Sequence, residues 1–324
     1  IKMNKNTNKK YEFATNPTIG ANTYAGQLSL PYVSAAVKSN LTVTGGGVRT
    51  VDGFNSKAVI SNLSVAEPLA SASCDFDPTN TTIGESVITL TDLNVNVQYC
   101  RGRIYDTWIG QGMDRNGDLP GTFESFILET LVANVGQSIE NAMWKGSTTF
   151  GTGFLSNDGS FGNVSFGNSA LANFATQELS DDPSVDKILD NLEEVYTKVV
   201  SDKSAILSKP GFGFYMNQKM YSYYTMKLAS ATTFQQLGAA GEFTGLSYMG
   251  YPIYICPGMF DDAIVATYPE NLVMATNALS DLNEVRIIPA YQYDGSDNIN
   301  VVMKFAAGVG AGVPTDGVVG YNFA

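Results

Sequence analysis

The residues best suited to bind a metal ion are Asp114, Asn116 and Asp118, whose side-chain oxygens alternate along the chain. This spacing opens a calcium-binding loop, which also requires glycine at its sixth position and a bidentate acidic residue at its twelfth. Those two positions hold Leu119 and Ser125. The segment Asp114–Asp118 therefore carries only part of a calcium motif, and a turn leading into a helix cap explains it more simply. We assign no metal site.

The chain has few residues suited to catalysis, because none of its 324 residues is a histidine. Its absence removes the commonest general base and the histidine-dependent nucleophilic sites. Two pairs of adjacent carboxylates remain, Glu193-Glu194 and Asp261-Asp262. Neighbours in sequence point in different directions, so a solvated surface explains both pairs better than an acid/base site. We expect no catalytic residues and no enzymatic activity.

Two glycine-rich segments resemble parts of nucleotide-binding loops. The first, residues 45–47, lacks the Lys-Ser/Thr ending of a phosphate loop, and the second, residues 308–312, follows a strand without a helix after it. Backbone flexibility is the simpler interpretation of both, so no cofactor is expected. The cysteines Cys74, Cys100 and Cys256 fit neither a disulfide framework nor a zinc site. We expect three reduced, mostly buried thiols.

The composition is low in charge and acidic in balance. Charged residues make up 15% of the chain and the net charge is −12, against about 25% charged residues in a typical domain. Either much of the surface faces neighbouring subunits, or a loop-rich β fold uses Asn, Ser, Thr and Gly as its polar surface. An acidic chain is repelled by nucleic acid and anionic membranes. Any contact with DNA is therefore expected to be non-specific, and no membrane partner is expected.

The aromatic group around the predicted third helix has two interpretations. Its side chains could stack against carbohydrate, but packing in a core or an interface is the more common use of such residues. The group consists of Tyr215, Tyr221, Tyr223 and Tyr224.

The first hundred residues lack the apolar content of an independent domain. Residues 1–38 are polar, with a lysine-rich start, and are predicted to form an extended arm. The chain begins at Ile1 without the apolar run of a signal peptide, which is compatible with removal of an upstream segment. Residues 81–90 and 94–99 alternate as two strands joined around Asp92. The span from about 40 to 100 is predicted to project as a long β-hairpin that is unstable alone.

The strongest helical signal covers residues 119–145. Asp118 and Pro120 are typical of a helix start, and Lys145 followed by Gly146 is typical of its end. At about 1.5 Å per residue, the helix would be about 40 Å long. Its apolar stripe consists of Phe123, Phe126, Ile127, Leu131, Val135, Ile139 and Met143.

The second half of the chain mixes helices and strands. Asp182 and Pro183 predict the start of a second helix, and Asn217 predicts the cap of a third helix over residues 218–228. A strand is predicted at residues 212–215. Further strands are predicted at residues 251–256, 263–268, 272–276, 284–291 and 298–305. The fold class expected from this order is α+β.

The order of these parts resembles the tailed-bacteriophage major capsid protein family. The closest likeness lies in residues 119–147, followed by Gly153-Phe154-Leu155. Further likeness lies in residues 250–259, in residues 271–285, and in residues 301–309, which are similar to a closing strand. The resemblance covers nearly the whole chain and depends more on the order of elements than on any single motif.

The resemblance implies a tailed-phage major capsid fold with defined parts. These are an N-terminal arm (1–38), an E-loop hairpin with flanking strands (39–100), a peripheral domain with a spine helix at about 119–145 (101–175), a mixed α/β axial domain (176–290) and a return strand of the peripheral domain (291–324). Some family members cross-link an E-loop lysine to a neighbouring subunit. Lys57 lies in the expected E-loop, but no acceptor motif is evident, so that chemistry is not transferred.

The same resemblance implies a structural subunit that self-assembles as pentamers and hexamers into an icosahedral shell around a viral genome. Portal and decoration proteins are possible further partners, and the expected location is the virion, assembled in the bacterial host cytoplasm. Three alternatives stay open. They are an encapsulin-like nanocompartment shell, a secreted β-rich binding protein and, least supported, a carboxylate-based hydrolase.

Overall fold

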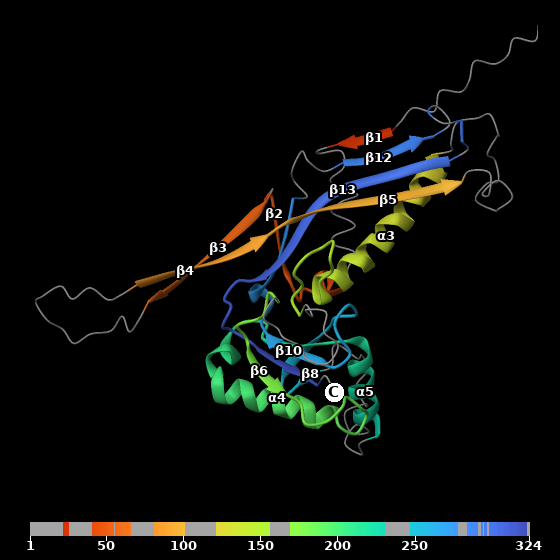
Figure 1. Ribbon diagram of the computed structural model, residues 1–324. Helices are drawn as coiled ribbons and strands as arrows, with labels where there is room; N and C mark the ends of the chain where they lie inside the picture. The colour runs from red at the N-terminus through yellow and green to blue at the C-terminus, as the bar shows by residue number, and fades with distance from the viewer. Residues whose placement is uncertain are drawn as a thin grey trace, which may run out of the picture.

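A computed structural model describes residues 22–25, 41–54, 56–65, 81–100, 121–155, 169–230, 247–277, 284–290, 293, 295–296 and 298–322. Two bodies lie one above the other, and a two-stranded ribbon projects from the side of the upper one (Figure 1). The long helix α3 (Gly121–Lys145) crosses the upper body and ends where the two bodies meet. The molecule therefore divides into an upper body, a lower body and the ribbon.

The upper body is a mixed sheet whose strands come from both ends of the chain. The order is β1-β12-β13-β11-β2, and β5 pairs with the other edge of β13. Among the strand pairs that the described residues form in this sheet, β2 and β11 run parallel and the others antiparallel. A short helix, α2 (Leu41–Thr44), precedes β2. The strands are β1 (Asn22–Ala25), β2 (Arg49–Asp52), β5 (Thr91–Cys100), β11 (Leu272–Thr276), β12 (Glu284–Pro289) and β13 (Asn298–Ala311).

Helix α3 packs its apolar stripe against this sheet. Strand β13 alternates between a buried side facing the core and a half-buried or exposed side over residues 298–304. The helix contributes Leu131, Val135, Ile139 and Met143, all of which are buried, to the same core. The helix expected at 119–145 is thus present. The expected cap, residues 118–120, lies outside the described residues, as does the partial calcium motif at residues 114–118.

The lower body is built on a second six-stranded sheet with the order β6-β14-β10-β7-β9-β8. One face packs against helices α4 (Ile188–Asp202) and α5 (Gln218–Ser230). The other face packs against the end of α3 and the loop after it. Short 3-10 helices cover Ser204–Ser208 and Pro269–Asn271. The strands are β6 (Ala175–Glu178), β7 (Gly213–Met216), β8 (Ser247–Tyr248), β9 (Tyr251–Ile255), β10 (Ala263–Thr267) and β14 (Val318–Tyr321).

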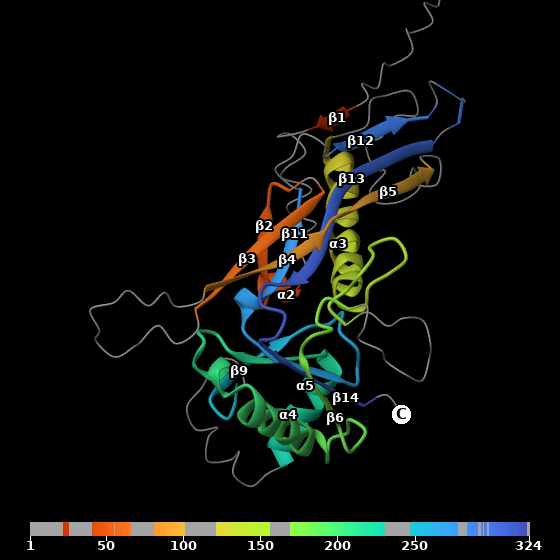
Figure 2. The ribbon, with the colours of Figure 1, turned by 60° about the vertical axis from the view of Figure 1, so that its left-hand side comes forward.

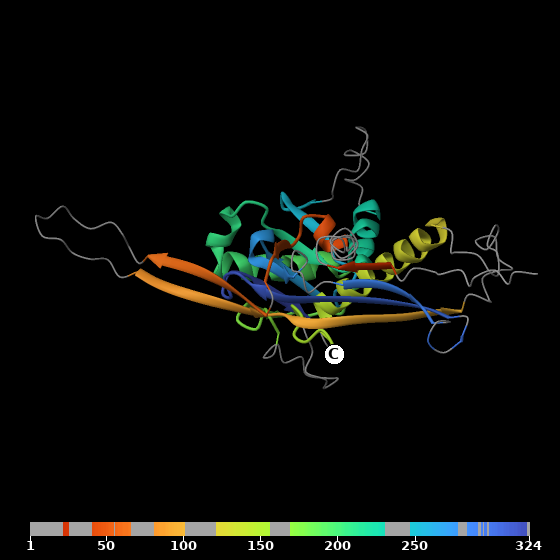
Figure 3. The same ribbon diagram turned by 90° about the horizontal axis from the view of Figure 1, so that it is seen from above.

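The ribbon consists of β3 (Lys57–Val65) paired antiparallel with β4 (Thr81–Thr89). The two alternating runs expected to join around Asp92 are present as β4 and β5, but they meet at Leu90 and do not pair with each other. Strand β4 pairs with β3, and β5 pairs with β13. Figure 3 shows β4 and β5 as one long, gently curved track that passes alongside β13 and continues into the ribbon.

Helix α4 starts later than the sequence predicts. Asp182 and Pro183 precede the helix, which begins at Ile188, and Lys187 at its N-cap makes no side-chain cap hydrogen bond. The Asp182 carboxylate instead accepts a hydrogen bond from Asn322 Nδ2 at 3.1 Å, so it tethers the end of the chain. The third helix fits its predicted cap better, because the backbone N–H of Lys219 donates to Asn217 Oδ1 at 3.0 Å.

Candidate functional site

The outer face of the ribbon carries an apolar row that nothing in the described structure covers. Val59 and Val87 lie opposite each other across the two strands, and Ile83 lies on the same face four residues along β4. Their exposed fractions are 50%, 54% and 69%. The other face is buried at the root of the ribbon, where Ala58 and Ile88 pack against the upper body. An exposed apolar row on a projecting strand pair is typical of a contact surface.

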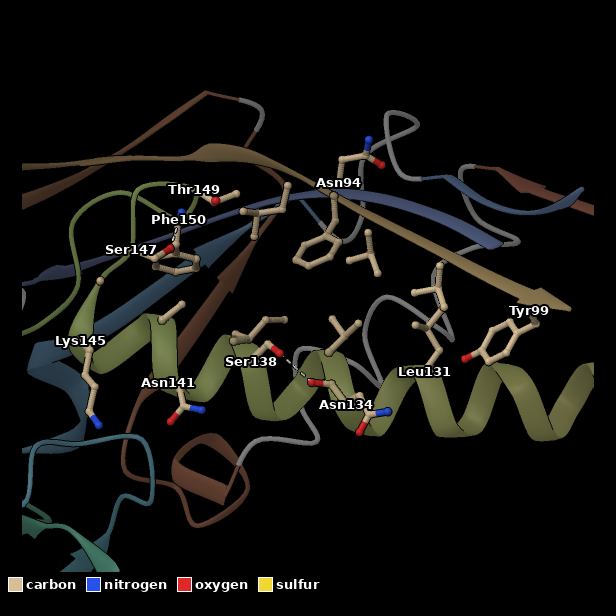
Figure 4. A pocket seen from close by; sticks show the side chains of 18 residues that line it. Asn94, Tyr99, Leu131, Asn134, Ser138, Asn141, Lys145, Ser147, Thr149 and Phe150 are labelled. Carbon is tan, nitrogen blue, oxygen red and sulfur yellow. Dashed lines mark hydrogen bonds between the residues drawn. The ribbon is translucent and has the colours of Figure 1, made fainter. Parts of the chain in front are cut away.

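A groove of about 690 Å³ runs between strand β5 and helix α3 (Figure 4). Its walls are mostly apolar, and its rim carries polar side chains from the helix, including Asn134, Ser138 and Asn141. Lys145 borders the groove at the end of the helix, but its side chain points away from β5, and its ammonium lies 5.4 Å from the centroid of the Phe260 ring. Among the described residues, no strand pairs with the free edge of β5 that borders this groove. The walls are formed by Leu93, Val95, Val97, Tyr99, Leu131, Val135, Ile139, Phe150 and Phe305.

A buried polar junction joins the start of the upper body to α3. The Glu140 carboxylate accepts hydrogen bonds from the backbone N–H of Thr42, at 3.2 Å, and from the Thr42 hydroxyl. Trp144 Nε1 donates to the same hydroxyl at 3.3 Å, and Gly258 donates its backbone N–H to the carboxylate. Burial raises the pKa of Glu140, while these hydrogen bonds oppose the rise. The junction therefore holds a carboxyl group surrounded by donors.

Tyr215 extends this junction into the lower body. Its hydroxyl donates to the backbone carbonyl of Gly47 at 2.8 Å, and its ring stacks on Tyr254 with a centroid separation of 4.7 Å. Trp144 also contacts Tyr215, with a separation of 6.2 Å between the ring centroids. The turn that follows α2 is thus bonded to the sheet of the lower body as well as to α3.

The remaining residues singled out in the sequence do not gather into a site. Cys256 is buried, and burial raises the pKa of its thiol well above the ordinary value, whereas Cys100 is exposed, contrary to the expectation of mostly buried thiols. Cys74 lies outside the described residues. Asp261 pairs with Lys219 at 3.4 Å on the surface. Lys57 begins β3 and is exposed.

The tyrosine group is divided between two environments. Tyr215 and Tyr224 are buried, and Tyr221 and Tyr223 are half-buried against the lower-body core. This arrangement favours packing over carbohydrate stacking. Within the described residues, no group of three or more acidic, cysteine or histidine side chains could hold a metal ion. None of the described helices is both long enough and apolar enough to cross a membrane.

The two glycine-rich segments have different roles from the flexible ones expected. Gly46 takes a positive φ of 71° in the turn after α2, and the Gly47 carbonyl accepts the Tyr215 bond. Residues 308–311 lie inside strand β13 and are buried. Sequence reasoning also missed Glu140. A signal was available, because Gly136, Glu140 and Trp144 repeat every four residues beside the apolar stripe of α3.

The chain matches no family model and no curated protein sequence. It is similar in structure to a chain of the capsid of the native GTA particle, with 15% identity, a TM-score of 0.55, and coverage of 90% of this chain and 91% of that one. The procapsid of satellite phage P4 gives 11% identity, a TM-score of 0.57, and coverage of 90% and 98%. A chain of the capsid of Myoviridae phage XM1 gives 11% identity and a TM-score of 0.55, with coverage of 87% of this chain and 92% of that one. The chain therefore has the α+β fold of the tailed-phage major capsid proteins.

Proposed function

We propose that the chain is the shell-forming subunit of a tailed-phage capsid, assembling with copies of itself as pentamers and hexamers. The observation that carries this proposal is the structural likeness to phage capsid chains over about nine-tenths of the molecule. In such a shell, residues 1–38 act as the arm and 39–100 as the E-loop with its flanking strands, while the upper body with α3 acts as the peripheral domain and the lower body as the axial domain. The bounds 176–290 and 291–324 expected from the sequence do not follow this division, because β11 and β12 pair within the upper-body sheet and β14 within the lower-body sheet. The subunit has a structural rather than an enzymatic role.

The exposed surfaces support self-association, because the ribbon and the groove complement each other. The ribbon offers the exposed apolar row of Val59, Val87 and Ile83, and the groove offers mostly apolar walls. Glu85 lies between Ile83 and Val87 on the same face, and Asn134 and Ser138 supply polar groups on the helix side of the groove. A ribbon that docks in the groove of the next copy makes a head-to-tail contact, and such contacts close into rings.

The charge of the chain supports a container rather than a DNA-binding protein. With a net charge of −12, the subunit repels packaged DNA and is expected to touch it only non-specifically. The proposed location is the virion, after assembly in the bacterial cytoplasm. Portal and decoration proteins are proposed as further partners at the shell.

Electron microscopy and sedimentation of the expressed chain test this function. We expect closed shells, and a protein that stays at its monomer mass under all assembly conditions would contradict the proposal. Shells that hold an enzyme cargo and never DNA would favour the nanocompartment instead.

Val87→Lys tests whether the ribbon face makes the contact. It places a charge in the apolar row and should abolish shells while leaving the subunit folded. The matched control is Val200→Lys on α4, where a valine of similar exposure, 45%, lies far from the ribbon. Loss of shells in the control but not in Val87→Lys would contradict the assignment of this face.

Ser138→Trp tests the groove in the same way. The Ser138 hydroxyl donates to the Asn134 carbonyl on the exposed side of α3, and an indole there would fill the groove. Ser201→Trp is the control, because Ser201 is also an exposed serine whose hydroxyl donates to a carbonyl of its own helix. We expect shells from the control only.

A further inference from the structure

Strand β13 changes its surroundings halfway along its length. Over residues 300–304, its even-numbered positions face outward as Asn300, Val302 and Lys304, which are half-buried or exposed. From Ala306 onward, the even-numbered positions are buried and lie under the root of the ribbon. The odd-numbered residues face the main core along the whole strand. One face of one strand therefore carries larger, partly exposed side chains in its first half and only small residues, Ala306, Gly308 and Gly310, in its second.

The small residues are needed because β4 lies directly on the backbone of β13. A methyl group at Gly308 would lie 2.3 Å from the carbonyl oxygen of Thr89, and one at Gly310 would lie 2.4 Å from Cγ1 of Ile88. Carbon atoms in contact normally stand about 3.5–4.0 Å apart. The Ser86 hydroxyl also donates to the carbonyl of Ala311 at 2.6 Å. Figure 2 shows the ribbon leaving the upper body at this crossing, beside β2 and β11.

The crossing fixes the direction of the ribbon through packing. Ile88 has an exposed fraction of 1% and packs with Ala58, Ala275 and Ala306, so its side chain has little room to rotate. A larger residue at position 310 must therefore push β4 away from β13. Because the ribbon extends several residues beyond the crossing, a small tilt at its root becomes a large displacement at its far end.

We propose that Gly308 and Gly310 are positioning residues that set the angle at which the ribbon leaves the body, and through that angle the curvature of the shell. This inference rests on the proposed function, in which the ribbon reaches the neighbouring subunit. Pentamers and hexamers need neighbouring subunits at defined angles, and the glycine crossing supplies one such angle before assembly begins.

Gly310→Ala is the first test, with the diameter of assembled particles as its readout. We expect shells of wild-type diameter to be lost, and to be replaced by particles of another diameter or by open sheets. Ile88→Ala/Gly310→Ala should restore the diameter, because the nearest remaining atom, the Cβ of residue 88, is 3.5 Å from the new methyl group. Gly84→Ala is the matched control, since a methyl group there meets only the Asn62 carbonyl at 3.8 Å. Wild-type diameter in Gly310→Ala would overturn the proposal.

Gly308→Ala tests whether the glycine variants act through a specific steric clash or through a general loss of packing. Its obstacle is the backbone oxygen of Thr89, which no side-chain truncation removes, so Ile88→Ala should not rescue it. Rescue of Gly308→Ala by Ile88→Ala would show that the double variants act through loosened packing, and would also overturn the proposal. Circular dichroism on each dispersed subunit identifies variants that fail to fold. If Gly310→Ala fails to fold, the double variant Ile88→Ala/Gly310→Ala must fold and form shells of wild-type diameter, because it removes the atoms that the new methyl group would meet.

A distance measurement separates this proposal from the proposed function. Spin labels on cysteines introduced at Ser61 on the ribbon and Ser201 on α4, both exposed, report the ribbon angle in the dispersed subunit. Cys74 and Cys100 are replaced by serine, and Cys256 is too buried to react. We expect Gly310→Ala to shift this distance and Gly84→Ala to leave it unchanged. If wild-type protein forms no shells, the proposed function fails, and an unchanged distance in Gly310→Ala independently rejects the glycine crossing.

Discussion

The lower body and the ribbon are both β structure, but only the lower body buries both of its faces. In the lower body, Phe214 and Ile264 face helices α4 and α5, while Tyr215 and Val265 face the end of α3. The ribbon buries one face at its root and leaves the other open. Two strands without a second layer are marginally stable at best. The lower-body sheet is therefore stable within one subunit, whereas the ribbon needs a further contact to cover its open face.

This contrast separates stability from assembly. Substitutions in the lower body should change the free energy of unfolding of the subunit, whereas substitutions on the open face of the ribbon should change only its contacts with other molecules. Free energies of unfolding are measured on subunits kept dispersed by Val87→Lys, so that unfolding is not coupled to assembly.

The largest effect is expected from Phe214→Ala in the lower-body core. Phe214 is fully buried and packs edge-on against Phe212 and Tyr248, at ring separations of 5.8 and 5.6 Å. Its removal leaves a cavity and should lower the free energy of unfolding by about 3–5 kcal/mol. Urea denaturation measures the change. A loss below that caused by Val59→Ala on the ribbon would break the contrast.

A smaller effect is expected from Tyr215→Phe at the junction between the bodies. The substitution leaves the buried Gly47 carbonyl without its donor and should cost about 1–2 kcal/mol. Tyr254→Phe is the control, because the Tyr254 hydroxyl bonds the Gly211 carbonyl, at 3.0 Å, in an exposed setting where water can replace it. Equal losses in the two variants would show that the junction does not depend on this bond.

Glu140→Gln should alter how stability depends on pH. The pKa of Glu140 is raised above its ordinary value of 4.5, so the folded state binds more protons than the unfolded state between those two values. Its contribution is therefore present below about pH 4.5 and is lost as the pH rises through the folded pKa, with a slope of at most about 1.4 kcal/mol per pH unit.

The measurement is the difference in unfolding free energy between wild type and Glu140→Gln across this pH range. Asp262 also has a raised pKa, but it is present in both proteins and cancels in the difference. Asp186 and Asp202 have lowered pKa values and act below their ordinary value of 3.8, outside this range. A difference that does not vary with pH would show that the pKa of Glu140 is the same in the folded and unfolded states.

The smallest effect on the dispersed subunit is expected from Ile83→Ala on the open face of the ribbon. Ile83 has an exposed fraction of 69%, so its truncation should change the free energy of unfolding by about 0.5 kcal/mol or less. Hydrogen exchange of β4 amides in assembled particles should nevertheless become faster. A large loss in the dispersed subunit would mean that the ribbon face is already covered within one chain.

Local signals in the sequence were sufficient for most elements. Helix α3 follows from its apolar stripe, and the N-cap of α5 follows from Asn217, because both depend on neighbours within a few residues. The start of α4 was predicted too early, since the Asp182 carboxylate bonds Asn322, which is 140 residues away. The order of the parts led to the correct fold class even where individual boundaries moved.

Contacts between residues far apart in the chain could not be predicted from the sequence. The pairing of β5 with β13 joins residues about two hundred positions apart, so nothing local distinguishes it from a β4–β5 hairpin. Glu140 and Thr42 are 98 residues apart, and only the fold makes them neighbours. Gly308 and Gly310 could be recognised as glycines, but whether they allow flexibility or close approach depends on the strand that lies over them.

The continuity of β4 and β5 has a mechanical consequence. Because the two strands form one track, a pull along the ribbon is directed along β5 and loads the β5–β13 ladder in shear. All ten residues of β5 are in register with β13, so their hydrogen bonds share the load and must yield together rather than one at a time. The second strand, β3, leads back to β2, which pairs in parallel with β11. Both strands of the ribbon thus continue into the upper-body sheet, and the hydrogen bonds of that sheet, rather than those of the ribbon, resist a pulling force.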